Sequence, residues 1–193
     1  MKHYYLTALL FICLCRAIVS PAQGIHQLWS VTSSGGNDDN GTIFSTRFDG
    51  TGQRVRHNFD FINPGISPGI FQQPVQYNGK LYGMLRSGEA GSPVIFVFDP
   101  ASGQYQRAAT LGDIGGKLGI GSLTLVGDRL YGVCARENNL DGGLIFEFNP
   151  ANNQLVKKVS LTSTLGAIAV SNVVAINNKF YGLTKNGGVN NRG

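Results

Sequence analysis

The stretch Asn78-Gly79-Lys80-Leu81-Tyr82-Gly83 carries the pattern that decides the fold of this chain of 193 residues. The same pattern returns as Gly127-Asp128-Arg129-Leu130-Tyr131-Gly132 and as Asn177-Asn178-Lys179-Phe180-Tyr181-Gly182, and a weaker first copy is Gln27-Leu28-Trp29-Ser30. Repetition at intervals of roughly 50 residues is typical of propellers and other repeat architectures. The sequence therefore predicts one structural unit that recurs along the chain, the last time only in part.

Each unit carries a second landmark, an Ile-Phe pair that follows the first pattern at a nearly constant distance. The pairs are Ile43-Phe44, Ile95-Phe96 and Ile145-Phe146, and the chain reaches Gly193 before a further pair appears. Apolar residues at every position, as over residues 94–98, are typical of a strand buried between stacked sheets.

The repeated Tyr-Gly pair is interpreted as a packing device. We expect Tyr82, Tyr131 and Tyr181 to occupy equivalent sites on successive sheets, because their flanking residues repeat. The aromatic ring would pack between blades, and the glycine beside it would permit a close approach of the backbone.

The third copy shows the whole unit most clearly. Alternation of apolar and polar residues predicts strands over residues 122–126, 129–133, 143–148 and 154–161. The pairs Asn78-Gly79, Gly127-Asp128 and Asn177-Asn178 join the first two strands and accept positive φ at both positions, as a type I′ hairpin requires. The turn over residues 149–153 begins with Asn149, contains Pro150 and closes on a residue that tolerates left-handed backbone.

Four antiparallel strands per unit predict an all-β fold built from β-propeller-type blades. Basic residues on the last strand of each unit hinder pairing with other chains. They are Arg54, Arg56, Arg107, Lys157 and Lys158. We expect the first repeat over residues 23–70 (a blade lacking its innermost strand), the second over 71–119, the third over 120–169 and a truncated fourth over 170–193. About thirteen strands make three blades and a partial one, an incomplete ring that we expect to belong to a longer chain.

The first 22 residues are typical of a signal peptide for export. Lys2 gives a positive start, residues 6–15 form an apolar run, and Ser20-Pro21-Ala22 offers small residues at the cleavage site. An apolar run of this length is too short to span a bilayer, and no later stretch is long enough. We therefore expect an exported protein, extracellular or held at the cell surface, without a transmembrane segment.

Cleavage after Ala22 would change both the cysteine count and the charge. It would remove two of the three cysteines and leave Cys134 alone, which excludes a disulfide within the mature chain. It would also remove Lys2 and Arg16, which lowers the formal net charge from +5 to about +3. A mild positive charge on an exported chain favours contact with anionic polymers or surfaces, and no nucleic-acid partner is expected.

Unit length, the opening Asn78-Gly79-Lys80-Leu81-Tyr82-Gly83 and the close Ile-Phe-x-Phe-Asp-Pro over residues 95–100 together resemble the GloVer tandem repeats of bacterial "choice-of-anchor" proteins. The similarity runs from about Leu28 to the end of the chain. The units are also similar to distant Kelch-like repeats, whose Gly-Gly pair has counterparts in Gly35-Gly36 and Gly187-Gly188 but none in the middle copies. The resemblance implies a bacterial surface or secreted repeat protein and brings no catalytic residues.

The loops between the second and third strands, together with the loops that join blades, should gather on one face of a propeller. Polar groups there could bind a glycan, a peptide or a metal, although turns alone also favour Asn, Asp and Gly. The candidate ligand-binding residues are Asp38, Asp39, Arg86, Glu89, Arg136, Glu137, Asn138, Asn139 and Asp141.

Other features that could carry chemistry are incomplete. Asn37-Asp38-Asp39-Asn40-Gly41 resembles part of a calcium loop but lacks the first Asp and the bidentate Glu at the end. His26 and His57 have no partner at metal-ligand spacing, so no metal and no cofactor are expected. Cys134 fits a small buried thiol, and its distance from histidine in the sequence gives a Cys–His nucleophile no support.

These features predict a binding or display module without catalysis, whose partner is an extracellular glycan or protein. Two alternatives stay open: an inert spacer in a surface array, and a polysaccharide hydrolase or lyase of propeller type. The enzyme would need two carboxylates brought together in space, from among Glu89, Glu137 and Asp141. The fold alone does not decide, because propellers host both kinds of function.

Overall fold

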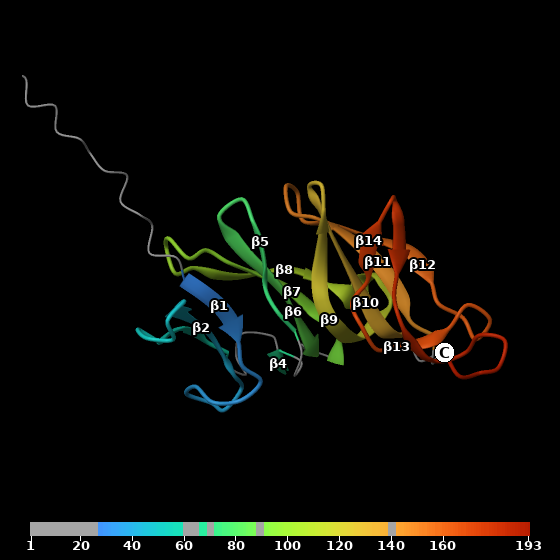
Figure 1. Cartoon of the computed structure of the whole chain (residues 1–193), viewed down its shortest axis with the longest axis horizontal. Coiled ribbons are helices and arrows are strands. Elements are labelled where there is room, and N and C mark those ends of the chain that lie inside the picture. The colour runs from blue at the N-terminus through green and yellow to red at the C-terminus, as the bar shows by residue number, and fades with distance from the viewer. Residues whose placement is uncertain (1–26, 60–65, 69–71, 88–90, 139–141) are drawn as a thin grey trace, which may run out of the picture.

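The computed structural model describes residues 27–59, 66–68, 72–87, 91–138 and 142–193. These residues form antiparallel sheets that follow one another along the long axis of the molecule, with β1 toward one end and the C-terminus at the other (Figure 1). The all-β fold and the propeller-type blades that the repeats predict are confirmed.

Each of the first three repeats contributes one sheet, and the two strand pairs of the fourth repeat are together called the fourth sheet. The first sheet contains β1 (Gln27–Val31), β2 (Thr42–Arg47) and β3 (Arg54–Asn58). The second contains β4 (Ile66–Pro68), β5 (Val75–Tyr77), β6 (Lys80–Ser87), β7 (Val94–Phe98) and β8 (Tyr105–Thr110). The third contains β9 (Gly116–Val126), β10 (Arg129–Glu137), β11 (Leu144–Asn149) and β12 (Gln154–Ser160). The fourth repeat forms two strand pairs, β13 (Ala167–Ala169) with β16 (Thr184–Asn186) and β14 (Val174–Ile176) with β15 (Lys179–Tyr181).

In the second, third and fourth blades the innermost strand starts earlier than the repeat boundary expected from the sequence. β4 starts at residue 66 rather than 71, β9 at 116 rather than 120, and β13 at 167 rather than 170. Left-handed backbone at Leu118 (φ 55°) and Ile168 (φ 56°) interrupts the regular alternation from which strands are predicted. The early part of the strand therefore has no periodic signal in the sequence.

Side chains of the innermost strand β9 also bond to backbone groups just before strands β5 and β14 of the neighbouring blades. The backbone N–H of Gln73 donates to Ser122 Oγ at 2.6 Å, between the second and third sheets. The Thr124 hydroxyl donates to the Val173 carbonyl at 2.5 Å, between the third and fourth sheets. Contact between corresponding strands of successive sheets is what a radial stack of blades requires.

Two large buried clusters fill the spaces between the first three sheets. The cluster between the first and second sheets comprises Ile43, Phe59, Leu81, Leu85, Val94, Phe96 and Phe98. The cluster between the second and third sheets comprises Tyr82, Met84, Ile95, Leu111, Leu123, Leu130, Cys134, Leu144, Phe146 and Phe148. β7 contributes to both clusters, so both of its faces are buried, as its two-sided apolar pattern predicts.

The repeated tyrosines occupy equivalent positions, as predicted. In each sheet the tyrosine lies opposite a residue of the innermost strand, in the pairs Val75–Tyr82, Thr124–Tyr131 and Val174–Tyr181. The Tyr82 ring lies 6.3 Å from that of Phe148 in the third sheet, and the Tyr131 ring lies 4.6 Å from that of Phe180 in the fourth. The rings of Tyr82 and Tyr131 therefore pack between blades, whereas Tyr181 is exposed.

The hairpin turns agree with the type I′ prediction at two of the three places. Asn78 and Gly79 both have positive φ (48° and 74°), as do Asn177 and Asn178 (49° and 60°). In the remaining turn only the first central residue, Gly127, has positive φ (60°), which defines type II′ rather than type I′. A glycine in the first position is sufficient for that turn, so the type I′ prediction is wrong there.

The described strands form an open row of blades and do not close into a ring, because the first and fourth sheets lie at opposite ends of the molecule (Figure 1). The outer faces of these end sheets expose apolar side chains, such as Val55 (58%) in the first and Tyr181 (54%) in the fourth. Within the part of the chain that the structure describes, no helix is long and apolar enough to cross a bilayer.

Candidate functional site

The loops that follow the second strand of each blade lie beside the segments that join the blades. The backbone N–H of Phe59 donates to the Gly41 carbonyl at 3.0 Å, and that of Asn138 donates to the Gly115 carbonyl at 2.6 Å. At the fourth sheet the backbone N–H of Gly188 donates in the same way to the Ser163 carbonyl at 2.9 Å. We term the edge that these loops form the rim, and its described residues are 33–41, 85–87, 91–93, 111–115, 135–138, 161–166 and 187–193.

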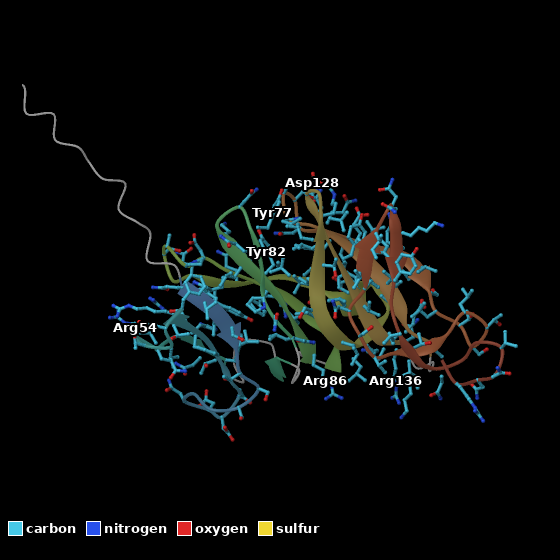
Figure 2. All side chains as sticks on the ribbon, viewed as in Figure 1. Arg54, Tyr77, Tyr82, Arg86, Asp128 and Arg136 are labelled. Carbon is cyan, nitrogen blue, oxygen red and sulfur yellow. The ribbon has the colours of Figure 1, made fainter. Side chains whose placement is uncertain are left out.

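Basic side chains lie on the rim where the second and third sheets meet. Figure 2 shows Arg86, near the end of β6, and Arg136, near the end of β10, pointing outward from the same edge of the molecule. Both side chains are exposed. Lys117 of β9 lies opposite Arg136 in the strand register, and its ammonium group donates to Ser92 Oγ at 3.0 Å. Cationic groups from two neighbouring blades therefore share one stretch of the rim.

Glu137, a predicted ligand-binding residue, lies at the end of β10 and binds within its own sheet. Its Oε1 is 2.6 Å from Lys157 Nζ on β12. Hydrogen bonds from Lys157 and Ser160 hold the pKa of Glu137 below its usual range. Lys157, predicted to protect the outer edge of the blade, therefore also ties that edge to the second strand across β11.

The turn that resembles a calcium loop is closed by its own hydrogen bonds. The backbone N–H of Gly35 donates to Asp39 Oδ1 at 2.6 Å, and that of Asn37 donates to Asn58 Oδ1 at 3.3 Å. Asp38 and Asp39 are both exposed, and the Asp39 carboxylate fixes the turn. Among the described residues, no three or more His, Cys, Asp or Glu side chains are grouped so that they could hold a metal ion. Four predicted residues, Glu89, Asn139, Asp141 and His26, lie outside the described residues.

His57 and Cys134 both serve packing. The His57 ring stacks on Tyr105, with centroids 4.2 Å apart, and meets Phe59 edge-on at 5.4 Å. Cys134 is fully buried between the second and third sheets, and this burial raises the pKa of its thiol far above the usual range. A buried, protonated thiol packs as a small apolar group and does not act as a nucleophile.

The two glutamates of the third sheet are both held ionised. Glu147 on β11 lies 3.0 Å from Lys158 Nζ and accepts a hydrogen bond from the Tyr131 hydroxyl at 3.0 Å. The bond from Lys158, with a smaller contribution from Tyr131, lowers the pKa of Glu147. The pKa of Glu137 is lowered in the same way by Lys157. A general acid for glycoside hydrolysis needs a raised pKa, so neither group is prepared for that role.

A groove that the sequence patterns did not predict lies between the third and fourth sheets. Its volume is about 210 Å³, and most of its lining residues are apolar, with Ser171 and Thr184 as polar members. Val133 and Ile145 of the third sheet form one wall, and Phe180 and Gly182 of the fourth repeat form the other. The groove lies beside Tyr181-Gly182, the repeated pair of the fourth copy, which is the signal in the sequence nearest to it.

Comparison with known proteins identifies the fold and a family. A chain in the structure titled "Crystal structure of Nidogen/Laminin Complex" is similar over 76% of this chain, with a TM-score of 0.52 and 18% sequence identity. The present chain spans 49% of that chain, and the likeness shows the propeller-type fold alone. No curated protein is significantly similar to the chain. The family model described as the Gloeobacter/Verrucomicrobia repeat matches residues 18–193.

Proposed function

The chain belongs to the Gloeobacter/Verrucomicrobia repeat family, and from this premise we propose that it is a non-catalytic binding or display module that works outside the cell or at the cell surface. Its ligand is an acidic glycan, which binds along the rim. The export part of this proposal rests on residues 1–22, whose charged start, apolar run and small residues are typical of a signal peptide.

The observation that supports glycan binding is the group of cations where the second and third sheets meet. Arg86 and Arg136 are exposed and point outward on neighbouring blades (Figure 2). Lys117, directly opposite Arg136, adds a third positive charge. The planar guanidinium group matches a carboxylate or sulfate with two parallel hydrogen bonds, so two arginines on adjacent blades suit successive acidic sugars of one polymer.

The rival proposal, a polysaccharide hydrolase or lyase of propeller type, gains less from the described residues. Glu137 and Glu147 are both paired with lysines, and their pKa values are lowered. Ionised, lysine-bound carboxylates stabilise a sheet but do not donate the proton that a leaving sugar needs. Binding without turnover is therefore the function that these contacts support best.

Titration calorimetry with a carboxylated and a sulfated polysaccharide tests the proposal on the purified chain. We expect binding that weakens as salt rises, because exposed charges are screened within about 10 Å at 0.1 M salt. The double variant Arg86→Ala/Arg136→Ala should lower the affinity at least about tenfold, since charge-assisted hydrogen bonds are lost.

Arg54→Ala/Arg107→Ala is the matched control, because it removes the same charge from the outer strands β3 and β8. Arg54 lies well away from Arg86 and Arg136 (Figure 2). Equal losses in the two double variants would show a diffuse charge effect and contradict a rim site. Release of reducing or unsaturated sugar ends during the titration would instead favour the enzyme.

A further inference from the structure

Arg86 lies on the side of the second sheet that faces the third. Side chains alternate between the two faces of a strand, so Arg86 shares a face of β6 with Met84, two residues earlier. Met84 belongs to the cluster that is buried between the second and third sheets, whereas Leu85 belongs to the cluster between the first and second. The Arg86 side chain therefore leaves the rim on the face of β6 that is directed toward the third sheet.

Two cations of the third sheet lie on the side that faces the second. Arg136 follows Cys134 by two residues on β10, and Cys134 belongs to the cluster between the second and third sheets. Lys117 is the register partner of Arg136, and paired residues of neighbouring strands share one face of a sheet. The bond from Lys117 Nζ to Ser92 Oγ, just before β7, places it on that side as well. Cations from two sheets that pack about 10 Å apart are thus directed toward one junction.

The lysine of this junction is held by packed residues. Lys117 is half-buried, and its bonding partner Ser92 is only 5% exposed. A Cβ atom on Gly112, in the segment that joins the two blades, would lie 2.6 Å from Ser92 Oγ, and the Leu111 N–H donates to the Pro93 carbonyl at 2.9 Å. An ammonium group has three N–H donors, so one bond to Ser92 orients the group and leaves it able to bind an anion.

The carboxylates near this junction do not match its positive charge. Among the described residues, Asp113 is the carboxylate closest to Lys117 in the chain, and it is exposed. Glu137 follows Arg136, but its Oε1 lies 2.6 Å from Lys157 Nζ, so its charge is already offset. Like charges that are directed toward one another repel, and an anion between them would lower that repulsion.

We propose that this junction binds a tetrahedral oxyanion carried by a sugar, a sulfate or phosphate ester, in preference to the planar carboxylate of an acidic sugar. The inference rests on the proposed function, because it names the acidic group of the glycan that binds along the rim. A carboxylate presents two oxygens in one plane, which a single arginine takes with parallel hydrogen bonds. A sulfate or phosphate ester presents three diverging terminal oxygens, so Arg86, Arg136 and Lys117 can each bind a different one.

Lys117 is the residue that sets this preference. Arg86 and Arg136 are exposed at the rim and pair equally well with either kind of anion. Lys117 is half-buried and fixed at Ser92, so it contributes a third donor from a direction that a planar group bound to one arginine does not reach. A charge held in this way is also screened less by salt than the exposed arginines are.

Titration calorimetry with three dextran oligosaccharides of equal length and degree of substitution tests the inference on the full chain. One is sulfated, one phosphorylated and one carboxymethylated, and at about pH 5 each acidic group carries roughly one negative charge. We expect at least one ester to bind at least about tenfold more tightly than the carboxymethyl probe. The ester that binds more tightly identifies the natural group.

Lys117→Met removes the charge and keeps an apolar side chain of similar length. It should weaken binding of the preferred ester about tenfold and that of the carboxymethyl probe at most about twofold, so the preference disappears. Lys185→Met is the matched control, because Lys185 is an exposed lysine of β16 in the fourth sheet, and the preference should remain. Lys117→Arg keeps the charge and should retain most of the preference.

The outcomes separate this inference from the proposed function. Equal affinity of the wild-type chain for all three probes, or a preference that survives in Lys117→Met, would overturn the inference and leave glycan binding at the rim intact. Equal losses in Lys117→Arg and Lys117→Met would also overturn it, since packing and not charge would then be responsible. No binding of any probe to the wild-type chain would overturn the proposed function as well.

Discussion

The interface between the second and third sheets and the interface between the third and fourth sheets begin with the same motif but are filled differently. At the first, Tyr82 is only 6% exposed and the Phe146 ring sits on Gly132. At the second, Tyr131 packs against Phe180, but Gly182 faces an open groove. At the first interface β11, the third strand of the following blade, packs on the glycine, and among the described strands none takes that place at the second.

This comparison separates two contributions to blade packing. The tyrosine of the Tyr-Gly pair places its ring toward the next blade, and the glycine leaves space for a side chain on the side of the previous blade. In the second and third sheets a phenylalanine of the third strand fills this space and becomes part of the core. A tightly packed interface between two blades therefore needs both the Tyr-Gly pair and the phenylalanine of the third strand.

Removal of Phe146, whose ring packs on Gly132, should have the largest effect on stability. Phe146→Ala should lower the free energy of unfolding by about 3–5 kcal/mol, because it leaves a cavity between two tightly packed sheets. Phe180→Ala, at the open interface, should cost only about 1 kcal/mol, because Phe180 is already 39% exposed. Urea denaturation followed by far-UV circular dichroism measures both values. Similar losses for the two variants would show that the third and fourth sheets form as complete an interface as the second and third.

A methyl group added at Gly132, which is covered by a phenylalanine ring, should have a different effect from one added at Gly182, where there is open space. Gly132→Ala should destabilise the chain by about 1–3 kcal/mol, because the new Cβ overlaps the Phe146 ring. Gly182→Ala should be neutral or stabilising by about 0.4–1 kcal/mol, because the space is open and the unfolded chain loses freedom. Each variant controls for the other, since the chemical change is identical. A clear loss of stability in Gly182→Ala would contradict the open space beside Gly182.

The smallest effect is expected at the ion pair that ties β10 to β12 in the complete third blade. The folded-state pKa of Glu137 is lowered by Lys157, so this pair stabilises the fold above the unfolded pKa of about 4.3 and loses its effect as pH falls through the folded value. Glu137→Gln should cost at most about 1 kcal/mol at pH 7, because the pair is partly exposed.

The difference between wild type and Glu137→Gln should shrink toward zero as the pH falls below that range, which denaturation at pH 7 and pH 3 can measure. Asp38→Asn, which neutralises an exposed loop carboxylate, is the control and should leave stability unchanged at both pH values. A pH-independent loss in Glu137→Gln would show that packing, and not the charge pair, is responsible.

Turns were the part of the fold that the sequence predicted most closely. The Asp and Asn residues expected to cap the turns after the third strand do so: Asp99 Oδ1 accepts from the Ala101 N–H at 2.9 Å, and Asn149 Oδ1 accepts from the Ala151 N–H at 3.0 Å. Gly103 closes the first of these turns with a φ of 73°. Such bonds span only a few residues, so the local sequence is sufficient to specify them.

The contacts of the loop side chains were predicted less completely, and ligand binding by them stays a prediction. The rim itself is where the blade order places it, and Arg86 and Arg136 lie there together (Figure 2). Glu137, predicted as a rim ligand, is instead held by Lys157 from a strand 20 residues away. The groove was missed because its lining comes from two repeats that lie up to about 50 residues apart, and the pattern of one repeat does not show how far the next one approaches it.

The sequence by itself determined the all-β repeat, the turn chemistry and the two-sided burial of β7. These follow from local backbone preferences and from a side-chain period of two, both of which are properties of short stretches. Only the tertiary structure decided which glycines of the Tyr-Gly pairs are covered by a phenylalanine ring, which carboxylates are paired with lysines, and where the innermost strands start. The physical reason is that each of these depends on atoms from another strand or another blade, and their approach is set by packing rather than by neighbours in the chain.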